Sequence, residues 1–477
     1  MHIALINANA VKPPLSPIGL LYLAAYLRDH GHIVELHDPY LDDDARSPQD
    51  ALVGRLRRGP RPDLIGFSIR NIDSAQMQQS RFFLPEADAL IHAVRAAYPD
   101  VPMVLGGAGF SLEPASILEL TGADYGIVGE GELALAALVE RLAARRAVDD
   151  VPGLVFRWDD GSLQENPPVN ADAEFLRHLP LQALDLVDYE RYFLHGGSAS
   201  VQTKRGCAQH CSYCTYPLIE GRSYRLIAPV RVVDEMEYLA GKGYDYFHFS
   251  DSVFNVPRKH ALDVCDELSK RDLGAHWHAY TSPYRFDDEL AARMVRAGSD
   301  GVYFGVDSCS DKILQSYGKN YRQRDIYSAA EACRRHGLEF SFHLLIGPPG
   351  ENAETLAETL AVVDDIRPTA VFIAEGIRIY RGTPVQKQLI ARGLLSPTTP
   401  LLKPYFYYSE ELPPDATRRI LDFAQARDFV YCTAGGGSPQ LNRTIVDLYR
   451  EGFRGPLWKI LAEMKRRARR EVLAGAA

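Results

Sequence analysis

The sequence predicts an α/β protein with two parallel sheets in succession, and two observations support this class. Short β-like runs alternate with helical stretches over residues 1–145, and the same alternation returns over residues 196–390. Parallel strands need long crossover connections, which are usually helices, so each part favours a parallel sheet. A glycine-rich turn follows a strand-like run in the first part and a cysteine-rich loop follows one in the second, where open sheets bind ligands.

The first part contains the β-like runs HIALINA, IVELHD, DLIGFSI, VPMVL and YGIVGEGE. They predict an open, Rossmann-like sheet with helices on both faces. Gly106 and Gly107 follow the fourth run, where residues without side chains let the backbone approach a ligand closely. Arg70 follows the third run, so we expect it at the same edge of the sheet.

The rest of the chain divides into three predicted parts. Residues 146–195 are rich in Pro and Asp, which indicates a hairpin followed by a linker. Residues 196–390 contain six strand–helix units and fit a partial (β/α)6 barrel of the TIM type, in which active residues collect at the C-terminal ends of the strands. Residues 391–477 predict a small, mostly helical C-terminal region that ends in a basic amphipathic helix.

Composition and charge restrict the class of protein. A chain of 477 residues suits two or three domains, and contents of 46% apolar and 24% charged residues are typical of globular proteins. A net charge of −9 argues against a nucleic-acid partner held through its phosphates. No apolar run approaches the length of a membrane span and the N-terminus enters a strand at once, so we expect a cytoplasmic protein without a membrane partner.

Three of the seven cysteines, Cys207, Cys211 and Cys214, form a C-x3-C-x2-C loop. Cysteine thiolates hold iron–sulfur cubanes, usually four per cluster, so three in one loop would leave one iron open to a small molecule. The alternative is a Cys3His zinc site with His210, although structural zinc ligands usually come as two separated pairs. A disulfide is not expected, because the other cysteines are scattered singly. The spacing therefore favours a [4Fe–4S] cluster.

The loop TKRGCAQHCSYCTYP resembles that of the radical SAM superfamily, whose members cleave S-adenosylmethionine (SAM) into methionine and a 5′-deoxyadenosyl radical. The stretches PPLSPIGLLYLAAYLRDHGHIVELHD, VLGGAGFS and ADYGIVGEGE resemble the cobalamin-binding domain of one subfamily. The resemblance implies a [4Fe–4S] cluster, SAM and an electron donor of the flavodoxin or ferredoxin type. The sequence does not decide whether the first part binds cobalamin, because the D-x-H-x-x-G motif that supplies a histidine to cobalt is absent. Arg70 would lie under the corrin or anchor the domain interface.

The resemblance also implies SAM contacts. Ser250 and Asp251 would bind the amino group of SAM, and an N-cap role is the alternative for Asp251. Asp307 stands where relatives usually have Glu, and its shorter side chain makes its reach to ribose or methionine uncertain. The further expected SAM contacts are Tyr213, Ile346, Gly347 and Tyr380.

Two reactions remain open on this resemblance, radical dehydration and cobalamin-dependent methyl transfer. The shorter chain and the missing cobalt motif favour dehydration of a 1,2-diol in a small polar substrate, as in the radical SAM dehydratases of aminoglycoside biosynthesis, with a partner reductase as a further expectation. The acidic residues Asp251, Asp307 and Glu375 would suit such a polyamine sugar. Tyr216 is the candidate proton donor, unless its ring only packs against SAM, and Glu220 and Glu375 are the alternative acids. A non-catalytic protein with a fully ligated cluster is the remote alternative.

Overall fold

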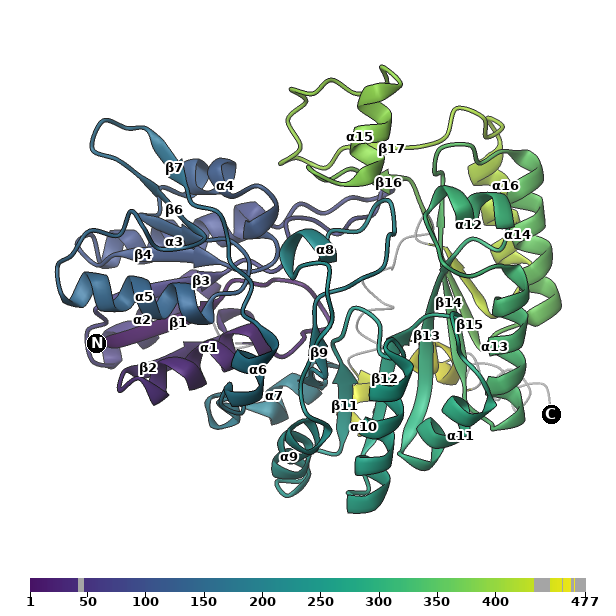
Figure 1. The fold of residues 1–477 in the computed structure, drawn as a ribbon, viewed down its shortest axis with the longest axis horizontal. Helices are drawn as coiled ribbons and strands as arrows, with labels where there is room; N and C mark the ends of the chain where they lie inside the picture. The colour runs from purple at the N-terminus through teal and green to yellow at the C-terminus, as the bar shows by residue number, and fades with distance from the viewer. Residues whose placement is uncertain (42–46, 433–446, 457, 465–466, 468–477) are drawn as a thin grey trace.

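The computed structural model describes residues 1–41, 47–432, 447–456, 458–464 and 467 of the chain. It contains two α/β parts that lie next to each other (Figure 1), the N-terminal part drawn in purple and blue and the second part in teal and green. The predicted fold class is confirmed. Within the described residues, no helix is both long and apolar enough to cross a membrane.

The first sheet has seven strands in the order β2-β1-β3-β4-β5-β6-β7. Strands β1 to β5 pair in parallel, and the hairpin β6–β7 extends the sheet in antiparallel fashion. The strands are β1 (His2–Asn7), β2 (Ile33–His37), β3 (Leu64–Ser68), β4 (Met103–Gly106), β5 (Tyr125–Ile127), β6 (Leu154–Arg157) and β7 (Leu163–Glu165). The helices are α1 (Ile18–Asp29), η1 (Pro39–Leu41), α2 (Pro48–Arg58), α3 (Leu84–Ala97), η2 (Phe110–Leu112), α4 (Pro114–Thr121) and α5 (Glu132–Ala143).

The predicted hairpin at the start of residues 146–195 is the pair β6–β7, and the segment that follows is partly helical. It contains α6 (Ala173–His178), η3 (Leu184–Leu186) and α7 (Tyr189–Leu194). The side chains of Asp172 and Asp188 cap α6 and α7 by accepting hydrogen bonds from backbone N–H groups in the first turn. The Asp residues that indicated a linker therefore start short helices.

The second sheet also has seven strands, all parallel, in the order β18-β15-β14-β13-β12-β11-β8. The strands are β8 (Ala199–Val201), β11 (Tyr246–Phe249), β12 (His276–Thr281), β13 (Ser299–Asp307), β14 (Phe340–Ile346), β15 (Ala370–Glu375) and β18 (Val430–Cys432). The first six are the predicted strands of the barrel, and β18 adds a seventh from the C-terminal region. The covering helices are α9 (Pro229–Ala240), α10 (Arg258–Arg271), α11 (Asp288–Arg296), α12 (Asp311–Ser316), α13 (Gln323–Arg335), α14 (Ala353–Ile366) and α16 (Ala416–Gln425).

Short elements complete the second part. They are β9 (Lys204–Arg205), β10 (Arg225–Leu226), α8 (Tyr216–Ile219), β16 (Ile377–Arg378), β17 (Phe406–Tyr407) and α15 (Pro384–Ala391). In Figure 1, α8 lies between the two large sheets. Residues 447–450 and 458–464 are helical, and the fully buried Trp458 packs against Gly301 of β13. Half of the predicted basic terminal helix lies outside the described residues.

Buried ion pairs join the two parts. Arg378 of β16 donates to Asp73, which follows β3, with 2.9 Å between Nε and Oδ2, and both side chains are buried. Arg205 of β9 donates to Glu132 of α5 at 2.6 Å, and Arg225 pairs with Glu130. Paired charges are the form in which Arg and carboxylates are found inside proteins. These contacts fix the relative position of the two sheets.

Candidate active site between the two sheets

A cavity of about 430 Å³ lies between the two sheets. Its lining comes from the ends of β1, β3 and β4 on one side and from β8, β11 and the cysteine-rich loop on the other. The predicted site residues that line it are Arg70, Gly106, Gly107, Tyr216, Glu220, Ser250 and Tyr380. Residues that were predicted from two separate sheet edges therefore meet in one place.

The edge of the first sheet is shaped by Gly107. Its φ of +97° lies in the region that favours glycine, and a Cβ there would come within 2.7 Å of the carbonyl oxygen of Ile69. Glycine is thus required here by the close approach of the chain after β3, and Gly107 lines the cavity. Among the described residues that line the cavity, this part of the chain contributes Arg70 and no histidine.

Arg70 reaches into the cavity without a partner. No hydrogen bond or ion pair joins its guanidinium to another described residue, and desolvation by the surrounding chain lowers its pKa. Its titratable neighbours are Tyr216 and Tyr280, both from the second part. The interface-anchor alternative for Arg70 is therefore not supported, because the anchors are Arg378, Arg205 and Arg225.

The cysteine-rich loop is held by backbone hydrogen bonds on both sides. The N–H of Cys207 donates to Gly221 (3.1 Å), that of Ser212 to Tyr317 (2.8 Å) and that of Cys214 to Cys211 (3.2 Å). All three cysteines are free thiols, as a cluster-binding loop requires. In the described part of the chain no group of three or more His, Cys, Asp or Glu side chains, the three cysteines included, is placed to hold a single ion, so side-chain placement alone does not separate the cluster from the zinc alternative.

The carboxylate of Asp307 is already bonded to two other side chains. At the end of β13 Asp307 adopts a φ of +62°, and its carboxylate bonds the Tyr213 hydroxyl at 2.6 Å and Lys319 at 2.5 Å. Lys319 also acts electrostatically on Cys211, so this buried pair lies beside the cysteine loop. The predicted reach of Asp307 to ribose or methionine is not supported by these contacts, and Tyr213 is held by Asp307.

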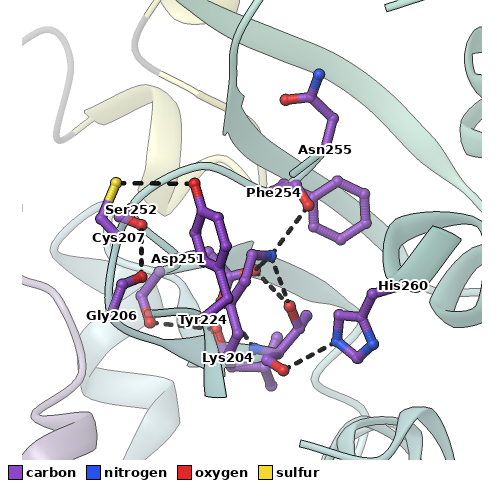
Figure 2. A network of polar contacts seen from close by, with 12 residues as sticks. Lys204, Gly206, Cys207, Tyr224, Asp251, Ser252, Phe254, Asn255 and His260 are labelled. Carbon is purple, nitrogen blue, oxygen red and sulfur yellow. Dashed lines mark hydrogen bonds and ion pairs between the residues drawn. The ribbon is translucent and has the colours of Figure 1, made fainter. Parts of the chain in front are cut away.

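Asp251 lies behind the cavity wall, where it pairs with Lys204 (Figure 2). The Lys204 ammonium donates to Asp251 (2.8 Å), to the Thr203 hydroxyl (3.0 Å) and to the carbonyl of Phe254 (3.0 Å). The backbone N–H of Thr203 donates to Asp251 at 2.7 Å, and both charged side chains are fully buried. These contacts favour a structural role over the predicted contact with the SAM amino group, and Asp251 is not an N-cap either.

Ser250 is accessible from the cavity, whereas Ile346 and Gly347 at the β14 turn are buried. Ser250 lines the cavity, with its hydroxyl donating to the Val201 carbonyl at 3.2 Å. Ile346 ends β14 and is fully buried, and Gly347 follows it with a φ of +113°. A Cβ at Gly347 would approach the ring of Tyr408 within 2.5 Å, so this glycine is required by packing. The predicted SAM contacts of Ser250, Ile346, Gly347 and Tyr380 stay predictions.

The three candidate acids have different surroundings. Tyr216 lines the cavity, and no hydrogen bond holds its hydroxyl within the described chain. Glu220 also lines it and accepts from the N–H of Gly206 at 3.0 Å; desolvation raises its pKa. Glu375 is buried outside the lining and accepts from Tyr408 (3.0 Å) and Thr417 (2.7 Å). An acid role for Glu375 is therefore not supported by its position, and the roles of Tyr216 and Glu220 stay predictions.

Sequence reasoning missed several side chains of the site. Lys319, Lys204 and His248 belong to it through contacts that span many residues of sequence, such as the pair Lys319–Asp307. Alternation along β11 places His248 on the same side as Ser250, which was predicted, so the strand periodicity could have identified it. The two lysines carried no comparable signal.

Comparison with known proteins identifies both parts. The family model "Radical SAM superfamily" matches residues 201–363, and "B12 binding domain" matches residues 4–139. The tryptophan 2-C-methyltransferase of Streptomyces laurentii is 28% identical over 79% of this chain and 72% of its own. The cytidylyl-2-hydroxyethylphosphonate methyltransferase of Streptomyces wedmorensis is 25% identical over 87% of each chain.

A solved structure extends the likeness to the whole molecule. The radical SAM methyltransferase TsrM from Kitasatospora setae, with cobalamin and a [4Fe–4S] cluster bound, has a TM-score of 0.86 and 25% identity over 100% of both chains. The family confirms the predicted cluster and SAM as cofactors, and the B12-binding domain supports cobalamin, which the sequence left open. The chain belongs to the radical SAM superfamily, in the cobalamin-dependent family that carries a B12-binding domain ahead of the radical SAM core.

Proposed function

We propose that this protein is a cobalamin-dependent radical SAM methyltransferase that acts on a small molecule. The observation that carries the proposal is the likeness over the full length of the chain to a cobalamin-binding methyltransferase of this family. The cavity adds support, because the B12-binding edge and the residues Thr215 and Tyr216, which directly follow the last cysteine of the loop, line the same space. When bound, the cluster supplies an electron and cobalamin supplies a methyl carrier.

The side chains present fit this chemistry. Cys207, Cys211 and Cys214 would hold the cluster, and Lys319 lies beside Cys211. The glycine turn at Gly107 would lie against the corrin.

The two observations that favoured dehydration, the shorter chain and the missing cobalt motif, no longer do so. The chain covers all of a methyltransferase, so its length does not separate it from the methylating relatives. The first part contributes no histidine to the described lining of the cavity but does contribute Arg70, which has no described partner, and this fits a corrin without a protein ligand. Methyl transfer, the alternative reaction, is therefore favoured. The substrate, the electron donor, the partner reductase and the cytoplasmic location stay predictions.

The products formed from SAM separate the two reactions. Methyl transfer leaves S-adenosylhomocysteine, whereas dehydration leaves only methionine and 5′-deoxyadenosine. We expect the anaerobically reconstituted protein to form S-adenosylhomocysteine in proportion to its corrin content. Formation of 5′-deoxyadenosine alone, unchanged when corrin is left out, would contradict the proposal.

Replacing Arg70 with alanine tests its place in the site. Because Arg70 has no protein partner to lose, we expect the free energy of unfolding to change by less than about 0.5 kcal/mol. The visible absorption spectrum of bound cobalamin should shift, since a cation beside the corrin is removed. An unchanged spectrum combined with a loss of stability would instead assign Arg70 to the domain interface.

A further inference from the structure

A band of aromatic and imidazole rings crosses the inner face of the second sheet, and neither the cluster nor the B12-binding edge accounts for it. Consecutive strands contribute neighbouring rings, which are His248 (β11), His278 and Tyr280 (β12), Tyr303 (β13), His343 (β14) and Phe372 (β15). Centroid distances between neighbours run from 4.7 to 6.3 Å. The rings thus form one continuous surface.

Tyr280 is the member of this band that is open to a ligand. Its ring stacks on that of Tyr303 at 4.7 Å and 17°, and His343 meets both rings edge-on. Yet 38% of Tyr280 remains accessible, and its hydroxyl has no hydrogen bond to the described chain. Tyr280 does not itself line the cavity, but its ring lies edge-on to that of His248, which does, with 6.3 Å between centroids. The open ring therefore lies next to the cavity wall that His248 forms.

The imidazoles of the band have unused polar atoms. His248 Nδ1, His278 Nδ1 and His343 Nε2 are buried, and no described protein atom bonds them. Burial lowers the pKa of His248 and of His343 to about 4, so both rings are neutral near pH 7. A buried polar atom without a partner costs stability, which makes these nitrogens candidates for hydrogen bonds with a ligand.

The three acidic residues expected to suit a polycation have partners within the described chain. Glu220, which accepts a hydrogen bond from the N–H of Gly206, is the candidate acid that lines the cavity. Asp251 is paired with Lys204, Asp307 with Lys319, and Glu375 accepts from two hydroxyl groups. The three acidic residues that favoured a polyamine sugar are therefore already engaged. The band itself presents the faces of aromatic rings and the hydrogen-bonding edges of neutral imidazoles.

We propose that the substrate is a planar aromatic molecule that stacks on Tyr280 and turns a polar edge toward His248 or His343. This inference rests on the proposed function, since it takes the space between the two cofactors as the substrate site. Offset stacking on an aromatic ring adds to the burial of the ligand's apolar area, and a saturated molecule of the same skeleton does not gain it.

The test compares two neutral probes with the same skeleton, 2-naphthol and its saturated form decahydro-2-naphthol, by calorimetric titration into the anaerobic holoenzyme. We expect 2-naphthol to bind with a Kd below about 1 mM and at least about five-fold more tightly than the saturated probe. Tyr280→Leu should weaken 2-naphthol about 3- to 10-fold and change the saturated probe less than about two-fold, whereas Tyr280→Phe should keep binding.

Tyr238→Leu is the matched control, because Tyr238 lies on α9 with a similar exposure of 42%. Equal affinity for both probes, no binding of 2-naphthol, or the same effect from Tyr280→Leu and Tyr238→Leu would overturn the proposal. Tighter binding of the amino sugar paromamine, used as a polycationic probe, than of 2-naphthol would also overturn the proposal, in favour of a polyamine sugar. Corrin-dependent S-adenosylhomocysteine formation is measured on the same samples, so a wrong substrate class is distinguished from a wrong reaction.

Discussion

Replacement of Cys211 with alanine is expected to abolish cluster binding and every reaction of SAM. A cubane held by three protein thiolates cannot lose one of them and keep its site, so iron should fall from about four per chain to near zero. The loop itself should persist, because the backbone bonds of Cys207, Ser212 and Cys214 do not involve the Cys211 side chain. Iron analysis and the visible spectrum after anaerobic reconstitution measure this effect.

Cys432→Ala is the matched control for Cys211→Ala. Cys432 lies in β18, at the far edge of the second sheet from β8, so its loss should leave the iron content unchanged. If Cys211→Ala still bound four irons and cleaved SAM, the assignment of the three-cysteine loop would be wrong.

Replacement of Lys204 with methionine is expected to destabilise the protein by about 3–5 kcal/mol, because it leaves the carboxylate of Asp251 buried without its cation. Both side chains are fully buried, so neither can turn to water. Urea unfolding measures the effect, and Lys259→Met provides the control, since Lys259 pairs with Asp263 on the exposed face of α10.

The same pair separates two roles of Asp251. If Asp251 is structural, a combined Lys204→Met and Asp251→Leu variant should regain much of the lost stability, since no buried charge remains. If it binds the amino group of SAM instead, Asp251→Asn should unfold like the wild type and bind SAM more weakly. That second result would contradict the role that the structure supports.

The fold was largely predictable because local patterns determine it. Alternating strands and helices specified both parallel sheets, and the spacing of Cys207, Cys211 and Cys214 indicated the cluster loop without any tertiary information. The glycine turn at Gly107 was placed at the cavity for the same reason, since parallel strands end at one edge.

The contacts of the acidic residues were not predictable, because their partners are remote in sequence. Asp251 and Asp307 follow strands as SAM-binding residues would, yet each is neutralised by a lysine, 47 residues away in the case of Asp251. A sequence shows where a carboxylate lies along a strand and does not show which cation packs against it. The aromatic band arose in the same way, from single rings on separate strands that become neighbours only through the register of the sheet.

The corrin content of the protein after reconstitution tests the central claim most directly. The protein is reconstituted anaerobically with iron, sulfide and hydroxocobalamin and then desalted, and corrin and iron are measured per chain. The account predicts close to one corrin per chain beside a complete [4Fe–4S] cluster. A complete iron–sulfur spectrum with no retained corrin would contradict it and return the first sheet to a structural role.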